Sequence, residues 1–209
     1  MPTIRASKRI NILYLCRINS SRGLMAEAIT NAFSGDGFRA YSAGIESIDF
    51  APEDGLAVIE RHGIPTEGLH PKLSTEFTGR RAPKFHFVIT LCNLDQGEVC
   101  PTWPGQPVRA HWNIVQPAPA AGREERLVQL DVLYNTMYRC VNAFLNLPLD
   151  VMDKFALAKE IDAIGVRMIP SEPGVAAPVA DDAPGAGVSP RPRPLPVRLR
   201  RPSAPVRLA

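Results

Sequence analysis

A cysteine and an arginine six positions apart are the residues of this chain whose types and spacing first suggest chemistry. Cys16 follows the apolar run of residues 10–15, and Arg22 closes the polar stretch after it. The apolar run predicts a buried strand, and the pattern that follows predicts a helix over residues 22–33. A loop between a strand and a helix N-terminus exposes several backbone N–H groups in one concave nest, where the helix dipole adds positive potential. We therefore predict an oxyanion-binding loop with a thiol at its base.

Each residue type in this loop has a chemical use. The nest, the helix end and Arg22 all favour thiolate over thiol, so the pKa of Cys16 is expected to be lowered. Arg22 could hold a tetrahedral oxyanion through two parallel hydrogen bonds, which lysine could not match. Asn19 tolerates a left-handed backbone and Ser20 offers a hydroxyl. The predicted oxyanion-binding residues are Arg17, Ile18, Asn19, Ser20, Ser21 and Arg22.

Three further cysteines lie at positions 92, 100 and 140. Four cysteines do not make a disulfide framework in a chain of this size, which leaves reactive use or core filling. Cys92 ends the apolar run of residues 85–91, and ligands of parallel α/β sheets bind at such carboxyl ends of strands. Cys140 lies in a helical stretch beside Val141 and Phe144, so we expect it in the core.

Strands that alternate with helices must position these residues, and this alternation predicts a parallel sheet. The predicted fold class is α/β, a three-layer arrangement of a four-stranded parallel sheet flanked by helices, with a disordered C-terminal tail. Strands are expected at residues 10–15, 38–43, 85–91 and 108–111, and helices at 22–33, 52–62, 122–147 and 151–164, the last stopped by Gly165.

The chain of 209 residues divides into three predicted parts: a domain at 1–147, a helical extension at 148–169 and a disordered Pro/Arg-rich tail at 170–209. The tail has six arginines from Arg191 onward and no acidic residue there. Its proline-spaced arginines fit either a polyproline II ligand or a solvated appendage. No aromatic residue lies between them, so a nucleic-acid partner is not expected.

Composition excludes several classes of protein. With 45% hydrophobic residues, 22% charged residues and a net charge of +3, the chain has the balance of a globular domain. No apolar run approaches the ~18–20 residues that would span a membrane, and the short N-terminal run lacks a cleavage site, so a cytoplasmic location is expected. His62, His70 and His86 lack metal-site spacing, and nothing indicates a metal, nucleotide or flavin cofactor.

Several short stretches in order carry a resemblance to a known family. They are residues 16–22, Met25-Ala26-Glu27-Ala28, Ser42-Ala43-Gly44, Val88 to Cys92, Cys100-Pro101 and His111-Trp112. Together they resemble the low-molecular-weight tyrosine phosphatase superfamily, and in particular its thioredoxin-coupled arsenate reductase branch, over roughly residues 9–147.

The resemblance implies a thiol relay. Cys16 would attack arsenate held by the loop and Arg22, and Cys92 would then attack Cys16 and release arsenite. Cys100 would resolve that disulfide and leave Cys92–Cys100 for thioredoxin or a similar dithiol reductant. The alternative for Cys92 and Cys100 is core filling.

The chain also departs from the family's pattern. Ile18 stands where the family has glycine, Gly23 where it has serine or threonine, and Gln116 before Pro117 where it has the general-acid aspartate. An amide cannot protonate a leaving alkoxide, and general acid catalysis contributes ~10²–10⁴-fold. Asp95 and His111 are possible substitutes, although His111-Trp112 reads better as a packed pair. Two alternatives to arsenate reductase therefore stay open: a phosphotyrosine phosphatase, and an impaired oxyanion-binding protein of the same fold.

Overall fold

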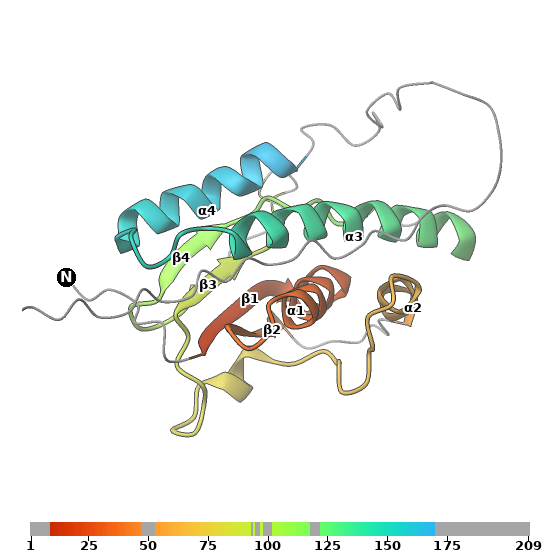
Figure 1. Cartoon of the computed structure of the whole chain (residues 1–209). Helices are drawn as coiled ribbons and strands as arrows, with labels where there is room; N and C mark the ends of the chain where they lie inside the picture. Colours follow the sequence, from red (N-terminus) through yellow and green to blue (C-terminus); the bar gives the residue numbers. More distant parts are fainter. Residues whose placement is uncertain are drawn as a thin grey trace, which may run out of the picture. The chain divides into compact units, whose positions relative to one another are not determined.

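The computed structural model describes residues 9–46, 53–92, 94, 97, 102–117 and 122–169. Cys100, Asp95 and the tail predicted at 170–209 lie outside these residues. The described part contains a four-stranded, fully parallel sheet in the order β2-β1-β3-β4, which confirms the predicted α/β fold (Figure 1).

The elements follow one another in the expected alternation. The strands are β1 (Ile10–Ile18), β2 (Phe38–Glu46), β3 (Phe87–Thr90) and β4 (Val108–His111), and the helices are α1 (Ser21–Phe33), α2 (Glu53–Arg61), η1 (Ser74–Phe77, a 3-10 turn), α3 (Arg123–Leu145) and α4 (Lys154–Met168). Local signals account for several helix starts. Glu124 and Glu125 lie in the first turn of α3, where negative charge is favourable, and the Asp153 carboxylate accepts hydrogen bonds from two backbone N–H groups of α4.

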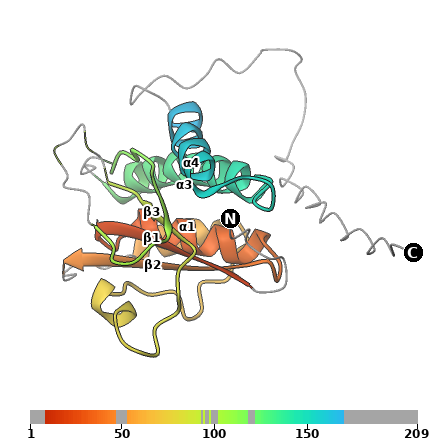
Figure 2. The ribbon, with the colours of Figure 1, turned by 90° about the vertical axis from the view of Figure 1, so that its left-hand side faces the viewer.

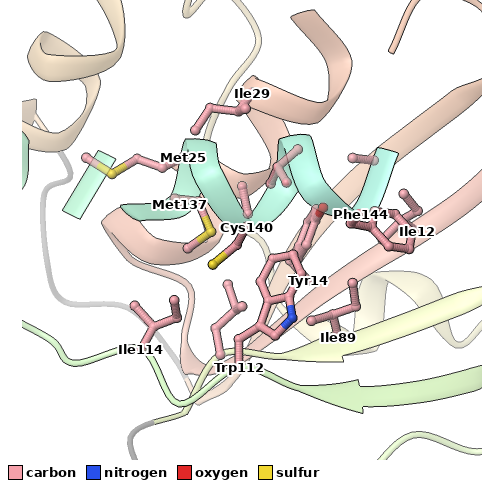
Figure 3. Close-up of a cluster of buried hydrophobic side chains, with 14 of the residues drawn as sticks. Ile12, Tyr14, Met25, Ile29, Ile89, Trp112, Ile114, Met137, Cys140 and Phe144 are labelled. Carbon is pink, nitrogen blue, oxygen red and sulfur yellow. The ribbon is translucent and has the colours of Figure 1, made fainter. Parts of the chain in front are cut away.

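Helices cover one face of the sheet. Ile12 and Tyr14 of β1 and Ile89 of β3 belong to a core to which α1, α2, α3 and α4 all contribute buried side chains. Figure 3 shows the part of this core that includes Met25 of α1 and Met137 of α3. Cys140 of α3 lies in the same core, as predicted. Burial raises the pKa of the Cys140 thiol to about 12, so this cysteine is an inert core residue.

The opposite face carries a thinner layer. Leu13 and Leu15 of β1 point to this side, where Phe77 of η1, Phe85 and Trp103 pack against them. The yellow segment that contains η1 lies below the strands in Figure 2, with α3 and α4 above them. The predicted three layers are therefore present, the third built from a single 3-10 turn and aromatic side chains.

Four predicted boundaries are wrong by three or more residues, namely the ends of β1 and β2 and both ends of α4. The ends of β1 and α4 have long-range reasons. β1 runs three residues past Leu15, because β2 also continues, to Glu46, and pairs with it up to Ile18. Gly165 does not stop α4, which continues to Met168. It packs against β4 instead: a Cβ there would lie 2.8 Å from Trp112 Cδ1 and 3.3 Å from His111 O. The absence of a side chain at this position lets the helix approach the strand.

Candidate active site at the carboxyl edge of the sheet

The strand order gives the sheet a topological switch point at its centre. From β1 the chain crosses to β2 on one side, and later to β3 on the other. Ligand sites in parallel sheets form where connections diverge in this way, at the carboxyl ends of the two central strands. That position lies between the ends of β1 and β3.

The two cysteines of the predicted relay flank this position. Leu15 of β1 pairs with Thr90 of β3, and the Leu91 N–H donates to Leu15 O at 3.0 Å. Cys16 directly follows Leu15 on β1, and Cys92 directly follows Leu91, two residues past the end of β3. Both side chains are fully buried. The structure thus places these two cysteines, 76 positions apart in the sequence, at the carboxyl ends of paired strands.

The loop between Cys16 and Arg22 is shorter than expected. Cys16 pairs with Gly44 and Ile18 with Glu46, so Arg17 and Ile18 continue the strand. Only Asn19 and Ser20 separate β1 from α1. Isoleucine is β-branched and favours extended backbone, which is consistent with this path. The binding roles of residues 17–22 stay predictions.

Two glycines let the loop pack closely against its surroundings. A Cβ on Gly44 would lie 2.5 Å from Asn19 N, so β2 and the loop could not approach each other as they do with any other residue there. A Cβ on Gly23 would lie 2.5 Å from Asn19 Oδ1 and 3.5 Å from Cys16 Sγ. The Asn19 amide therefore occupies space next to the position where the family has a hydroxyl side chain. Neither amide atom of Asn19 has a hydrogen-bond partner within the described part of the chain.

Arg22 links the loop to the segment after β4. It lies in the first turn of α1, is 2% exposed, and its Nη1 donates to Ile114 O at 2.9 Å. The same segment brings Gln116 to the loop, where Gln116 Oε1 lies 3.5 Å from Ser20 Oγ. The residue aligned with the family's general acid is thus near the loop, but its amide has no proton of suitable acidity to give.

Arg17 forms a second contact at the edge of the site. Its Nη1 lies 2.7 Å from Glu46 Oε2, and both side chains are roughly half exposed. An exposed pair of this kind contributes little to stability. Glu46 offsets part of the positive charge that Arg17 brings next to Cys16.

His111 and Trp112 hold the segment that carries Ile114 and Gln116. Trp112 is fully buried and its Nε1 donates to Ile161 O at 2.8 Å, while the His111 backbone N–H donates to Asp162 Oδ1 at 2.6 Å. Burial lowers the pKa of His111, against the opposing effects of Asp162 and of a hydrogen bond at Thr90. The prediction of a packed pair is confirmed, and its partner is α4.

Sequence reasoning missed a buried charged cluster beside the loop. Lys72 Nζ lies 3.0 Å from Glu27 Oε2, and the same oxygen accepts a hydrogen bond from Ser42 Oγ at 2.6 Å. Glu27 and Ser42 were noted only as parts of family stretches. Lys72, between Pro71 and Leu73, belongs to no recognisable pattern, because its burial depends on long-range pairing with β2.

Two further features, a membrane-spanning helix and a metal-binding cluster, are absent from the described residues. None of the helices there has the length and apolar character needed to cross a membrane. In the same residues, no three side chains of the His, Cys, Asp and Glu types come together as a metal ion would require.

Comparison with known proteins connects this geometry to a family. The profile described as "Low molecular weight phosphotyrosine protein phosphatase" matches residues 11–128. An arsenate reductase from Halalkalibacterium halodurans is 33% identical over 114 residues, which cover 54% of this chain and 78% of that protein. One from Oceanobacillus iheyensis is 35% identical over 119 residues, covering 57% and 81%. A solved structure titled "An arsenate reductase in the phosphate binding state" superposes with a TM-score of 0.51 at 19% identity, covering 65% of this chain and 96% of that one.

Proposed function

Because the chain belongs to the low molecular weight phosphotyrosine protein phosphatase family, we propose that it is an enzyme of the arsenate reductase type within that family. The observation that supports the proposal is that Cys16 and Cys92 lie at the carboxyl ends of the paired strands β1 and β3, Cys92 two residues past β3. A phosphatase needs only one of these thiols. A reductase needs both, because two electrons leave as a disulfide.

The first step is nucleophilic. The Cys16 thiolate attacks the arsenic of arsenate, an As–S bond forms, and one oxygen leaves as water after protonation. Arg22, at the start of α1, would bind the equatorial oxygens through its planar donors.

The second step reduces the metalloid. The Cys92 thiolate attacks Cys16 Sγ, an S–S bond forms, and the As–S bond breaks with its electron pair on arsenic. Arsenate is thereby reduced to arsenite and the two thiols are oxidised to one disulfide. No alkoxide leaves, so glutamine at position 116 costs this reaction less than it costs phosphate ester hydrolysis.

The third step regenerates the thiols. Cys100 would attack Cys92, form Cys92–Cys100 and release the Cys16 thiolate, after which a dithiol reductant such as thioredoxin reduces the new disulfide. Cys100 lies outside the described residues, so its part in the relay rests on the family resemblance and on its eight-residue spacing from Cys92.

The test is arsenite release from arsenate by purified protein with thioredoxin, thioredoxin reductase and NADPH, beside hydrolysis of an aryl phosphate. We expect arsenite release that Cys16→Ser and Cys92→Ser both abolish. Cys100→Ser should stop after about one equivalent, because a Cys16–Cys92 disulfide cannot be resolved. Cys140→Ala is the matched control, since this buried cysteine lies on α3 in the core.

The outcomes separate the alternatives. Arsenite release that survives Cys92→Ser would contradict the relay. Aryl phosphate hydrolysis without arsenite release would assign the site to phosphatase chemistry. Silence in both assays would leave an oxyanion-binding protein of the same fold and reject the enzyme proposal for these substrates.

A further inference from the structure

The cluster of Lys72, Glu27 and Ser42 combines buried charge with a position next to the loop. The side chains of Lys72 and Glu27 are 9% and 12% exposed. Lys72 Nζ also donates to His70 O at 2.8 Å, so the ammonium has two oxygen partners and little water. Removing one member of such a pair leaves an uncompensated buried charge, which is strongly unfavourable.

The three residues come from three different parts of the chain. Glu27 is on α1, Ser42 is on β2, and Lys72 is on the segment between α2 and η1. The ion pair and the hydroxyl therefore connect the helix that carries Arg22 to the strand that pairs with β1. Figure 1 shows α1 against β1 and β2 in this region.

Backbone contacts extend this connection to Cys16. The Gly44 N–H donates to Lys72 O at 2.9 Å, and Gly44 forms a parallel bridge with Leu73. Gly44 is also the ladder partner of Cys16 and packs against Asn19 N. The Lys72 segment thus lies along the outer edge of β2 at the level of the nucleophile.

A second path runs through the side chains. At Gly23, an added Cβ would meet Ser42 Cβ at 3.2 Å and Cys16 Sγ at 3.5 Å, so the first turn of α1 fits between them. Glu27 lies one turn further along the same helix. The Ser42–Glu27 bond holds this turn of α1 beside the thiol.

We infer that Lys72 is a positioning residue, which acts through Glu27 and Ser42 to fix α1 and β2 around Cys16 and Arg22. This inference adds to the proposed function a residue outside the relay, and it rests on that function for its catalytic meaning. Without the ammonium, the Glu27 carboxylate would be driven toward water, and local opening of the loop would follow.

The test measures Cys16 directly, so that it does not depend on turnover. Site-resolved mass spectrometry would follow alkylation of Cys16 by neutral iodoacetamide at pH 7, well below the unfolding temperature, in wild type, Lys72→Met, Lys72→Arg and Ser42→Ala. We expect Lys72→Met to speed the reaction by at least about fivefold through local opening, Ser42→Ala to speed it less, and Lys72→Arg to stay within about twofold. Lys154→Met is the control, since this lysine is exposed and bonds only Gln106 O among the described residues.

The same variants then link position to catalysis. With arsenate as substrate, Lys72→Met should lower kcat more than it raises KM, and Lys72→Arg should restore most of the loss. A folded Lys72→Met whose Cys16 alkylation lies within about twofold of wild type would overturn the inference. If Lys72→Met does not fold, Cys16 alkylation in Ser42→Ala at the wild-type rate would overturn the inference instead. A wild type without arsenate activity would reject the proposed function, while the alkylation rates would still decide the role of Lys72.

Discussion

Cys16 and Cys140 lie in the same hydrophobic core and are equally buried, yet we expect their thiols to differ in reactivity because of where each lies in the fold. Cys140 is in the middle of α3, where its backbone groups belong to the helix and its neighbours are apolar. Cys16 is near the carboxyl end of the central strand β1, which ends at Ile18, and α1 begins at Ser21. Burial alone therefore does not distinguish a reactive thiol from a structural one.

The difference lies in what surrounds each sulfur. Near Cys16 are the first turn of α1 and the Asn19 amide, whose two polar atoms have no hydrogen-bond partner among the described residues. A helix start and a free amide both favour negative charge nearby. Near Cys140, desolvation by burial outweighs the favourable effect of Arg139 and raises the thiol pKa. We therefore expect the end of β1 to accommodate an anion and the surroundings of Cys140 to exclude one.

Alkylation of the folded protein should show the largest contrast between the two regions. A pKa of about 12 for Cys140, against an ordinary 9.0, lowers its thiolate fraction by about a thousandfold at neutral pH. We therefore expect iodoacetamide at pH 8 to modify Cys16 while Cys140 stays unmodified, as read by peptide mass spectrometry. The comparison breaks if Cys140 reacts as fast as Cys16, and denaturant provides the control because it should make the two rates equal.

A general acid introduced at position 116 should sharpen the contrast between reductase and phosphatase chemistry. Gln116→Asp places a carboxyl group next to Ser20. We expect aryl phosphate hydrolysis to rise by roughly 10²-fold, the lower end of the usual gain from general acid catalysis, with a much smaller effect on arsenite release. Gln116→Asn is the control for size and should change neither rate in this way. An equal gain in both reactions would contradict the view that arsenate reduction proceeds without this acid.

Much of the fold was predictable because its signals are local. Apolar runs marked β1 and β3, and the strands predicted at residues 38–43 and 108–111 correspond to β2 and β4. The end of β1 was not predictable, since it depends on pairing with β2 through Ile18. Gly165 looked like a helix stop because glycine usually is one there, whereas its actual partner is Trp112, more than 50 positions earlier.

The residues of the candidate site likewise fall into those that local sequence predicts and those that depend on tertiary contacts. Spacing and residue type predicted Cys16, Arg22 and Cys92 as site residues, and the structure places Cys16 on β1 and Cys92 two residues past the neighbouring strand β3. Lys72 could not be found, because only the folded chain buries its ammonium against Glu27. The sequence thus identifies groups that react, and the residues that hold them in place emerge from tertiary contacts.

Gly165→Ala tests the contact that holds the helix-covered face to the edge of β4. The added methyl group would lie 2.8 Å from the ring of Trp112, which is fully buried. Overpacking costs about 1–3 kcal/mol, and the better helix propensity of alanine returns about 1 kcal/mol. We expect urea unfolding to show a net loss of roughly 1 kcal/mol. Gly79→Ala, where nothing lies within 4 Å of an added Cβ, should stay near wild type. A more stable Gly165→Ala would show that Trp112 is not tightly held.

The smallest expected effect is on the pH dependence of stability at the same contact. The pKa of His111 is lowered from its ordinary value of 6.5 in the folded protein, so the unfolded chain binds a proton more readily. The free energy of unfolding should therefore fall as pH decreases through 6.5 and level off below the folded-state pKa. His111→Asn can keep a polar partner for Thr90 Oγ1 without titrating. Urea titrations between pH 8 and pH 5 should show a shallower loss of stability in this variant. Parallel stability curves for the two proteins would mean that Asp162 offsets the cost of charging the imidazole. Its carboxylate accepts a hydrogen bond from the backbone N–H of His111.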